Sequence, residues 1–204
     1  MIVGYFYKKN EIMDKKKILV RNISNLSEAR YCAGMLVDFI SFELDQNEVN
    51  FIDLKKFSEI KGWINGIKLL GNSVYLTLNE IKELIKERDL DGFIFDYTQI
   101  NLIELLDCKL KILQIPINQL FTIDENIESK IDYLIIYGEK KDIDKDLLKE
   151  IQLTIPVFLG FNFENVTLDC ENLSGFAFNG TIELKPGYSS YNELMDALEF
   201  LDQD

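Results

Sequence analysis

Beyond about residue 17, short apolar runs alternate along the chain with longer segments whose apolar residues recur every three or four positions. Short runs rich in β-branched and aromatic residues predict strands, and the longer spacing predicts amphipathic helices. The predicted strands are Ile18–Ile23, Val37–Glu43, Asn65–Leu70, Asp91–Asp96, Leu110–Ile115, Asp132–Tyr137, Ile155–Gly160 and Gly175–Asn179. The predicted helices are Asn25–Met35, Leu78–Arg88, Asp144–Ile151 and Tyr191–Leu201.

Two of these helices begin after a residue suited to capping. Ser24 precedes the first helix and is its predicted N-cap, because a hydroxyl there accepts a hydrogen bond from a free backbone N–H group. Thr77 precedes the helix at 78–88, and Glu80 follows three positions later. This spacing predicts a capping box at the start of that helix.

Eight nearly apolar strands that alternate with helices predict a parallel sheet covered on both faces. Two architectures fit this order, an open doubly wound sheet and a closed (β/α)₈ TIM barrel. The number of units favours the barrel, although 204 residues is short for one. No linker rich in Pro, Gly or Ser divides the chain, so we expect a single domain at 18–204 after a short N-terminal extension at 1–17.

The composition narrows the classes of function. The chain has 22 basic and 35 acidic residues and a formal net charge of −13, which argues against general nucleic-acid binding. No apolar run approaches the roughly 20 residues that cross a bilayer, and no signal-peptide pattern is present. We therefore expect a cytoplasmic protein without membrane or nucleic-acid partners, whose oligomeric state the sequence leaves open.

The absence of histidine is the sharpest chemical constraint. It excludes imidazole bases, Ser-His and Cys-His pairs and imidazole metal sites, so acid–base chemistry would fall to carboxylates, Lys, Tyr or Cys. The three cysteines lack paired spacing, which indicates reduced thiols. No dinucleotide-binding, phosphate-loop or metal-ligand motif occurs, and we predict no cofactor and no metal.

A barrel places its functional site at the carboxyl ends of its strands. Those ends predict a mixed-charge polar ring at the barrel mouth, made of Arg21, Asn22, Glu43, Asp45, Lys68, Asp96, Gln114, Tyr137, Gly160, Asn179, Gly180 and Thr181.

The last two strand ends predict a phosphate site. Gly160 would let the backbone approach an anion, and Asn162 would cap a following helix whose N-terminal amides face the ligand. Asn179, Gly180 and Thr181 would add backbone and side-chain donors.

Four segments in collinear order resemble the phosphoribosylanthranilate isomerase family of tryptophan biosynthesis. ILVRNISNLSEARYCAGMLVDFISFEL is similar to the family's opening strand, helix and strand, and LTLNEIKELIKERDLDGFIFD to the segment that ends in its QLHG motif. IPVFLGFNFENV and AFNGTIELKPGYSS resemble its phosphate-binding segments. The resemblance spans about 18–201 and implies a TIM barrel and a phosphorylated ligand of the ribose-phosphate type.

The same resemblance implies that the family's catalytic residues are missing. The family's Amadori rearrangement uses a Cys base at the end of strand one and an Asp acid at the end of strand six. Arg21 stands at the Cys position and Tyr137 at the Asp position. A guanidinium stays protonated at physiological pH and cannot be the base.

Two functions remain open from the sequence. The first is a catalytically degenerate barrel that keeps a phosphate or anion pocket at the ends of strands seven and eight. The second is an active aldose–ketose isomerase with relocated groups. In it Glu43 or Asp96 would be the base and Arg21 or Lys68 the electrophile that stabilises a developing oxyanion.

Overall fold

A computed structural model gives the fold of the chain. It describes residues 15–139, 143, 145–149, 151, 153–161, 172–181 and 192–202. Residues 1–14 of the predicted extension, Asn162 and Cys170 lie outside the described residues, as do the predicted first residues of the last two helices, Asp144 and Tyr191. Within the described parts, no helix is long and apolar enough to cross a membrane.

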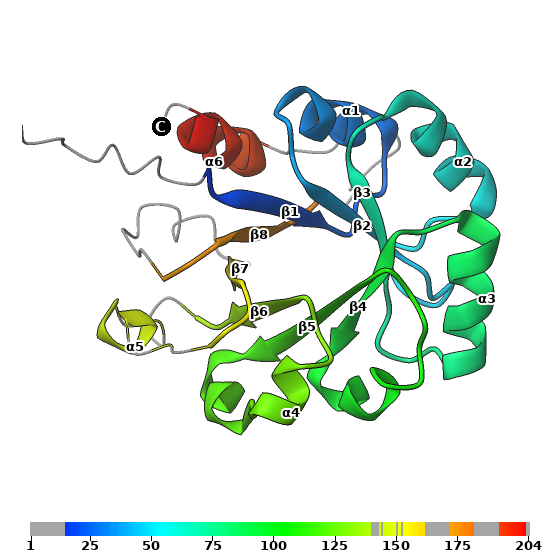
Figure 1. Ribbon diagram of the computed structural model, residues 1–204. Coiled ribbons are helices and arrows are strands. Elements are labelled where there is room, and N and C mark those ends of the chain that lie inside the picture. The colour runs from blue at the N-terminus through cyan, green and yellow to red at the C-terminus, as the bar shows by residue number, and fades with distance from the viewer. Residues whose placement is uncertain are drawn as a thin grey trace, which may run out of the picture.

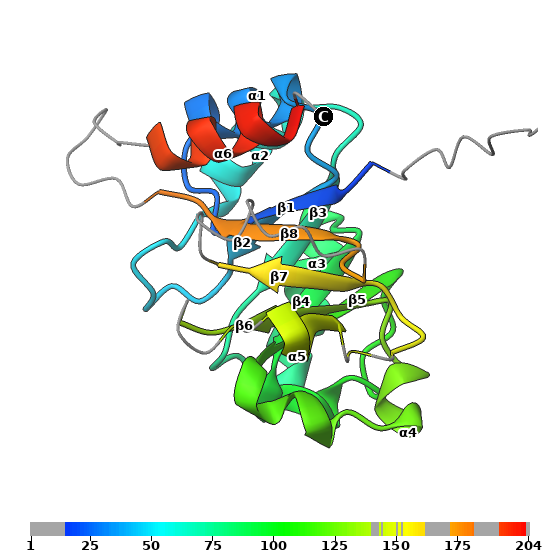
Figure 2. The ribbon, with the colours of Figure 1, turned by 90° about the vertical axis from the view of Figure 1, so that its left-hand side faces the viewer.

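Eight parallel strands form a closed barrel, as predicted (Figure 1). Each strand pairs with the next, and the last pairs with the first through the register Lys17↔Gly175 to Arg21↔Asn179. Figure 2 shows this closing seam between β1 and β8 from the side. The strands are β1 Lys17–Arg21, β2 Phe39–Glu43, β3 Lys68–Asn72, β4 Gly92–Asp96, β5 Leu110–Pro116, β6 Tyr133–Tyr137, β7 Val157–Gly160 and β8 Gly175–Asn179.

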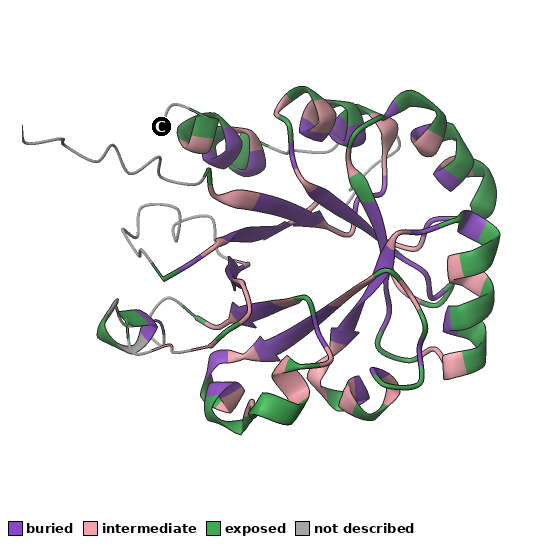
Figure 3. Cartoon of the chain, viewed as in Figure 1, coloured by how far each residue is buried: buried purple, intermediate pink, exposed green. Residues whose placement is uncertain are grey.

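Helices surround the barrel on the outside (Figure 1). Their outer faces are exposed, whereas the strands they cover are buried (Figure 3). The α-helices are α1 Leu26–Gly34, α2 Leu54–Trp63, α3 Leu78–Arg88, α4 Glu125–Glu128, α5 Lys145–Lys149 and α6 Asn192–Asp202, and the 3₁₀ helices are η1 Tyr97–Leu102 and η2 Ile117–Thr122.

The barrel interior holds one buried apolar side chain from each strand. Because side chains alternate along a strand, their strand neighbours point outward and pack under the helices. The larger, outer core lies there. The interior layer consists of Leu19, Phe39, Leu70, Ile94, Ile112, Ile135, Phe158 and Ala177.

Helix α3 has the bounds and the capping box that the sequence predicts. Thr77 Oγ1 accepts a hydrogen bond from Glu80 N, and the Glu80 carboxylate accepts one from Thr77 N. The prediction for α1 was wrong in its cap. Asn25, not Ser24, is the N-cap, and its side chain accepts from Glu28 N at 2.8 Å. The amide group of Asn25 reaches the N3 position that a cap must satisfy.

Strand β3 is displaced toward the C-terminus from its predicted position. The observed strand starts at Lys68 and continues through Gly71 to Asn72, whereas the prediction ended at Leu70. Glycine is unfavourable in strands, but a Cβ at Gly71 would lie 2.6 Å from Leu44 Cδ1, so packing explains the glycine. Lys68 therefore lies at the opposite end of the barrel from the mouth, where it pairs with Asp91 at 3.4 Å.

Candidate functional site

A layer of mostly polar side chains lies directly above the apolar interior layer. Two residues further along each strand the side chain points inward again, now at the carboxyl ends of the strands. One residue from each strand occupies this position. We call these residues the polar layer: Arg21, Ser41, Asn72, Asp96, Gln114, Tyr137, Gly160 and Asn179.

Arg21 connects opposite parts of the polar layer. Its Nε donates to Asn179 Oδ1 at 3.0 Å, and its Nη1 donates to Gln114 Oε1 at 2.6 Å. Burial lowers the pKa of the guanidinium, while the nearby Glu43, Tyr137 and Asp96 raise it. An arginine remains a cation under such opposing effects. Among the described residues no carboxylate lies within ion-pair distance of Arg21, so its partners there are neutral amides.

Gln114 extends this contact to Asp96. Its Nε2 donates to Asp96 Oδ2 at 3.4 Å while its Oε1 accepts from Arg21. The other oxygen of Asp96 caps η1 by accepting from Thr98 N at 3.0 Å and Thr98 Oγ1 at 2.8 Å. Four strands, β8, β1, β5 and β4, are thus joined by one chain of side-chain hydrogen bonds across the mouth.

Aromatic rings cover one side of Arg21. The Phe161 ring centroid lies 4.1 Å from the guanidinium carbon, which is a close cation–π contact. The Tyr137 ring lies 5.6 Å from that of Phe161. Burial and the charge of Asp96 raise the pKa of the Tyr137 phenol, and Arg21 opposes them. A phenol shifted in this direction is a poorer acid near neutral pH.

A second polar cluster surrounds Glu43 on β2. Its Oε1 accepts from Leu44 N and Asp45 N, both at 3.0 Å, and its Oε2 accepts from Asn72 Nδ2 at 2.8 Å. Asn72 also donates to Asn22 Oδ1 at 2.8 Å. Glu43 is 8% exposed, and burial raises its pKa to about 7 despite these hydrogen bonds.

The end of β8 is held by a buried carboxylate on α1. Glu28 is fully buried, and its Oε1 accepts from Thr181 N at 2.8 Å and Thr181 Oγ1 at 3.1 Å. Gly180 N donates to Arg21 O at 2.5 Å. Burial raises the pKa of Glu28 to about 7. The two Thr181 donors proposed for a phosphate are therefore already engaged.

The structure brings most of the predicted site residues together. Arg21, Asp96, Tyr137, Gly160 and Asn179 share the polar layer, and Glu43 lies beside it. Lys68 is not part of the site, and Asn162 lies outside the described residues.

Three residues of this region were missed from the sequence. Asn72 was missed because β3 was placed too early. Glu28 was missed because a glutamate in a helix looks solvent-exposed, although it follows the Asn25 cap by three residues. Phe161 lies in the segment that resembles a phosphate-binding motif, and no signal in the sequence points to its contact with Arg21.

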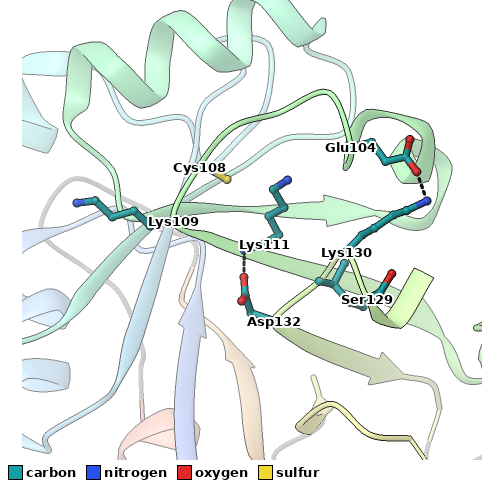
Figure 4. Close-up of a pocket in the computed structure, with 8 residues that line it drawn as sticks. Glu104, Cys108, Lys109, Lys111, Ser129, Lys130 and Asp132 are labelled. Carbon is teal, nitrogen blue, oxygen red and sulfur yellow. Dashed lines mark hydrogen bonds and ion pairs between the residues drawn. The ribbon is translucent and has the colours of Figure 1, made fainter. Parts of the chain in front are cut away.

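A surface cavity of about 470 Å³ lies at the opposite end of the barrel, where β5 and β6 begin (Figure 4). Lys111 donates to Ile103 O, and Lys130 pairs with Glu104, so two of its lysines are already bound within the protein. The described residues contain no group of Cys, Asp and Glu that could hold a metal ion. The cavity is lined by Glu104, Cys108, Lys109, Lys111, Ser129, Lys130, Ile131 and Asp132.

Comparison with known proteins identifies the fold. No protein-family model matches the chain, and no curated protein matches it in sequence. Solved structures do match. TrpF from Jonesia denitrificans is 11% identical with a TM-score of 0.74 over 92% of this chain and 97% of that one. The isomerase from Thermotoga maritima is 15% identical with a TM-score of 0.73 over 92% and 98% of the two chains.

A third match contains a ligand. A phosphoribosylanthranilate isomerase in complex with reduced 1-(o-carboxyphenylamino)-1-deoxyribulose 5-phosphate is 12% identical, with a TM-score of 0.66 over 93% of this chain and 100% of that one. Similarity at these identities establishes the fold. The resemblance predicted from the sequence motifs is confirmed at that level, and the chain is a single (β/α)₈ barrel with the fold of the phosphoribosylanthranilate isomerases.

Proposed function

We propose that this barrel does not catalyse the isomerisation of its structural relatives and instead binds a small anionic molecule at its mouth. The observation that carries this proposal is Arg21, a partly buried cation whose hydrogen-bond partners are neutral, at the position where the family's base is expected. The anion would lie against Arg21, beside the ends of β7 and β8.

The loss of catalysis is supported at both positions that the resemblance assigns to proton transfer. A guanidinium cannot accept a proton, and the raised pKa of Tyr137 makes its phenol a weak donor near neutral pH. Moreover, Arg21 fills its position with hydrogen bonds on two sides and a ring on a third. No other group can approach the same point in the layer without displacing it.

Anion binding is supported by the way Arg21 is surrounded. A cation removed from water is stabilised by an opposite charge more strongly than by amides. Its hydrogen-bond partners among the described residues are the neutral side-chain oxygens of Gln114 and Asn179, and the charges of Glu43 and Asp96 act on it without a direct ion pair. Gly160 lies in the same layer and has no side chain, although its backbone is buried among the described residues.

If the anion is a phosphate, fewer of the predicted residues are free to bind it than the sequence suggested. Gly160 and Asn179 belong to the polar layer with Arg21, whereas the Gly180 N–H already donates to Arg21 O. Thr181 would join them only after releasing Glu28, and the contribution of Asn162 is a prediction outside the described residues. A ribose-phosphate type of ligand remains the expectation from the family resemblance.

One observation favours a second function, an aldose–ketose isomerase with relocated groups. Glu43 has a pKa raised to about 7, which suits a general base near neutral pH. It lies close enough to Arg21 to influence the pKa of the guanidinium, and Arg21 would serve as the electrophile. Asp96 is the other candidate base, whereas Lys68 is too far away to take part.

Two measurements test the proposal. We expect no turnover of phosphoribosylanthranilate by the purified protein, and binding of ribose 5-phosphate in calorimetry. Arg21→Gln should weaken that binding about tenfold or more, since it removes the only cation of the polar layer. Arg30→Gln is the matched control, because Arg30 is an exposed arginine on α1.

Turnover that disappears in Glu43→Gln would establish the second function instead. If ribose 5-phosphate and inorganic phosphate bind the wild type and Arg21→Gln equally, Arg21 does not bind the anion and the proposal is wrong.

A further inference from the structure

The charges at the mouth are of both signs. Arg21 is the only cation of the polar layer and Asp96 is its only carboxylate, with Glu43 at the next inward position of β2. Lys68 would have added a second cation, but it lies at the other end of the barrel. A ligand with anionic groups alone would gain from Arg21 and be repelled by Asp96 and Glu43.

Gln114 lies between Arg21 and Asp96 and forms a hydrogen bond with each of them. Its amide oxygen faces Arg21 and its amide nitrogen faces Asp96, so the amide dipole follows the field between them. The two hydrogen bonds and the short amide limit the distance from Arg21 Nη1 to Asp96 Oδ2 to about 8 Å. A small molecule that accepts a hydrogen bond from one and donates to the other would span a similar distance.

Asp96 is better suited than Glu43 to receive a positive group. Each carboxylate accepts three hydrogen bonds, but Glu43 is only 8% exposed and both of its oxygens accept bonds of 3.0 Å or less. Among the described residues, Asp96 Oδ2 accepts one long bond of 3.4 Å from Gln114, and the residue is partly exposed. An oxygen with spare acceptor capacity at the rim of a binding site is positioned to bind a donor that the ligand brings.

We propose that the ligand of this barrel carries a protonated amine beside its anionic group. The anion binds Arg21, and the amine binds Asp96 Oδ2. The rings of Phe161 and Tyr137 form an apolar wall on one side of the short chain between them. This inference rests on the anion-binding function proposed above and adds the second charge that the ligand needs.

The chain has three arginines, Arg21, Arg30 and Arg88, so their side-chain Nε–H signals can be followed by NMR on ¹⁵N-labelled protein and assigned with Arg21→Lys. The probes are matched pairs that differ in one amine: O-phosphoethanolamine and ethyl phosphate, β-alanine and propionate, 4-aminobutyrate and butyrate. In at least one pair, we expect the amine-bearing member to shift the Arg21 signal at a concentration at least about fivefold lower than its amine-free partner requires.

Asp96→Asn removes the negative charge and keeps a side chain that caps η1, since Asn is as good an N-cap as Asp. In this variant both members of each pair should bind equally, while binding of the anion at Arg21 persists. Equal binding of both members by the wild type would overturn the inference and leave the proposed function intact. If no probe shifts the Arg21 signal, the proposed function fails together with the inference.

Discussion

Replacing Glu28 with Gln is expected to make the protein about 3 kcal/mol more stable above pH 7 and to leave its stability near pH 4.5 almost unchanged. The pKa of Glu28 is raised from 4.5 to about 7 by burial. A difference of one pKa unit between folded and unfolded states corresponds to about 1.36 kcal/mol. Glu28 is fully buried, so solvent screening reduces this effect little.

The sign follows from where the proton is held. Between pH 4.5 and about 7 the folded protein keeps the proton on Glu28, whereas the unfolded chain has lost it. The free energy of unfolding is therefore highest below pH 4.5 as far as Glu28 is concerned. It falls as the pH rises from 4.5 to about 7 and stays low above that pH. Glu43, whose pKa is also about 7, adds a loss in the same direction. The neutral amide in the Glu28→Gln variant carries no proton that can be lost in this range.

Urea unfolding followed by circular dichroism at pH 4.5, 6 and 8 measures this effect. The matched control is Glu83→Gln, which removes the same formal charge from an exposed position on α3. The profile of Glu28→Gln should be flatter than that of the wild type, and the Glu83→Gln profile should run parallel to that of the wild type. Parallel profiles for all three proteins would show that Glu28 titrates in the folded protein as it does in the unfolded chain.

The second large effect is expected from Gly175→Ala at the start of β8. A Cβ there would lie 2.1 Å from Lys17 O and 2.9 Å from Lys17 C, and both atoms belong to the backbone of β1. Two neighbouring paired strands cannot move apart here without loss of the hydrogen bonds that join them. We expect a loss of about 3 kcal/mol or more, or failure to fold, because β1 and β8 close the barrel.

Thermal unfolding of Gly175→Ala beside Gly62→Ala tests this expectation. Gly62 lies on the exposed side of α2, and a Cβ there meets nothing within 4 Å. Its replacement should stabilise the protein by about 0.5–1 kcal/mol through helix propensity. Equal melting temperatures for Gly175→Ala and the wild type would contradict the close approach of the two strands.

The fold could be predicted from the sequence because the strands of a barrel are buried, and buried strands appear in the sequence as short apolar runs. Each of the eight strands was found within a few residues, and α3 was found with its capping box. Helix α2 was not predicted, although Leu54, Phe57 and Ile60 have helical spacing after the N-cap Asp53. The same rules of spacing and capping therefore predict α2.

The site was harder to predict because it depends on register and on contacts across the barrel. Moving β3 by two or three residues exchanged Lys68 for Asn72 at the mouth, and no local signal fixes that register when Gly71 interrupts the apolar run. The contact of Glu28 with Thr181 joins residues 153 positions apart. Such pairs follow from closure of the barrel, not from any spacing along the chain.

The hydrogen-bond chain through Asn179, Arg21, Gln114 and Asp96 bears on how this barrel evolves. Placing a cysteine at position 21 would leave the amide oxygens of Asn179 and Gln114 without their donor in a partly buried layer. The cost of an unpaired buried acceptor is about 1–3 kcal/mol. Residues in one network also do not act additively. A cysteine at this position would therefore need further substitutions on other strands to be tolerated without this loss.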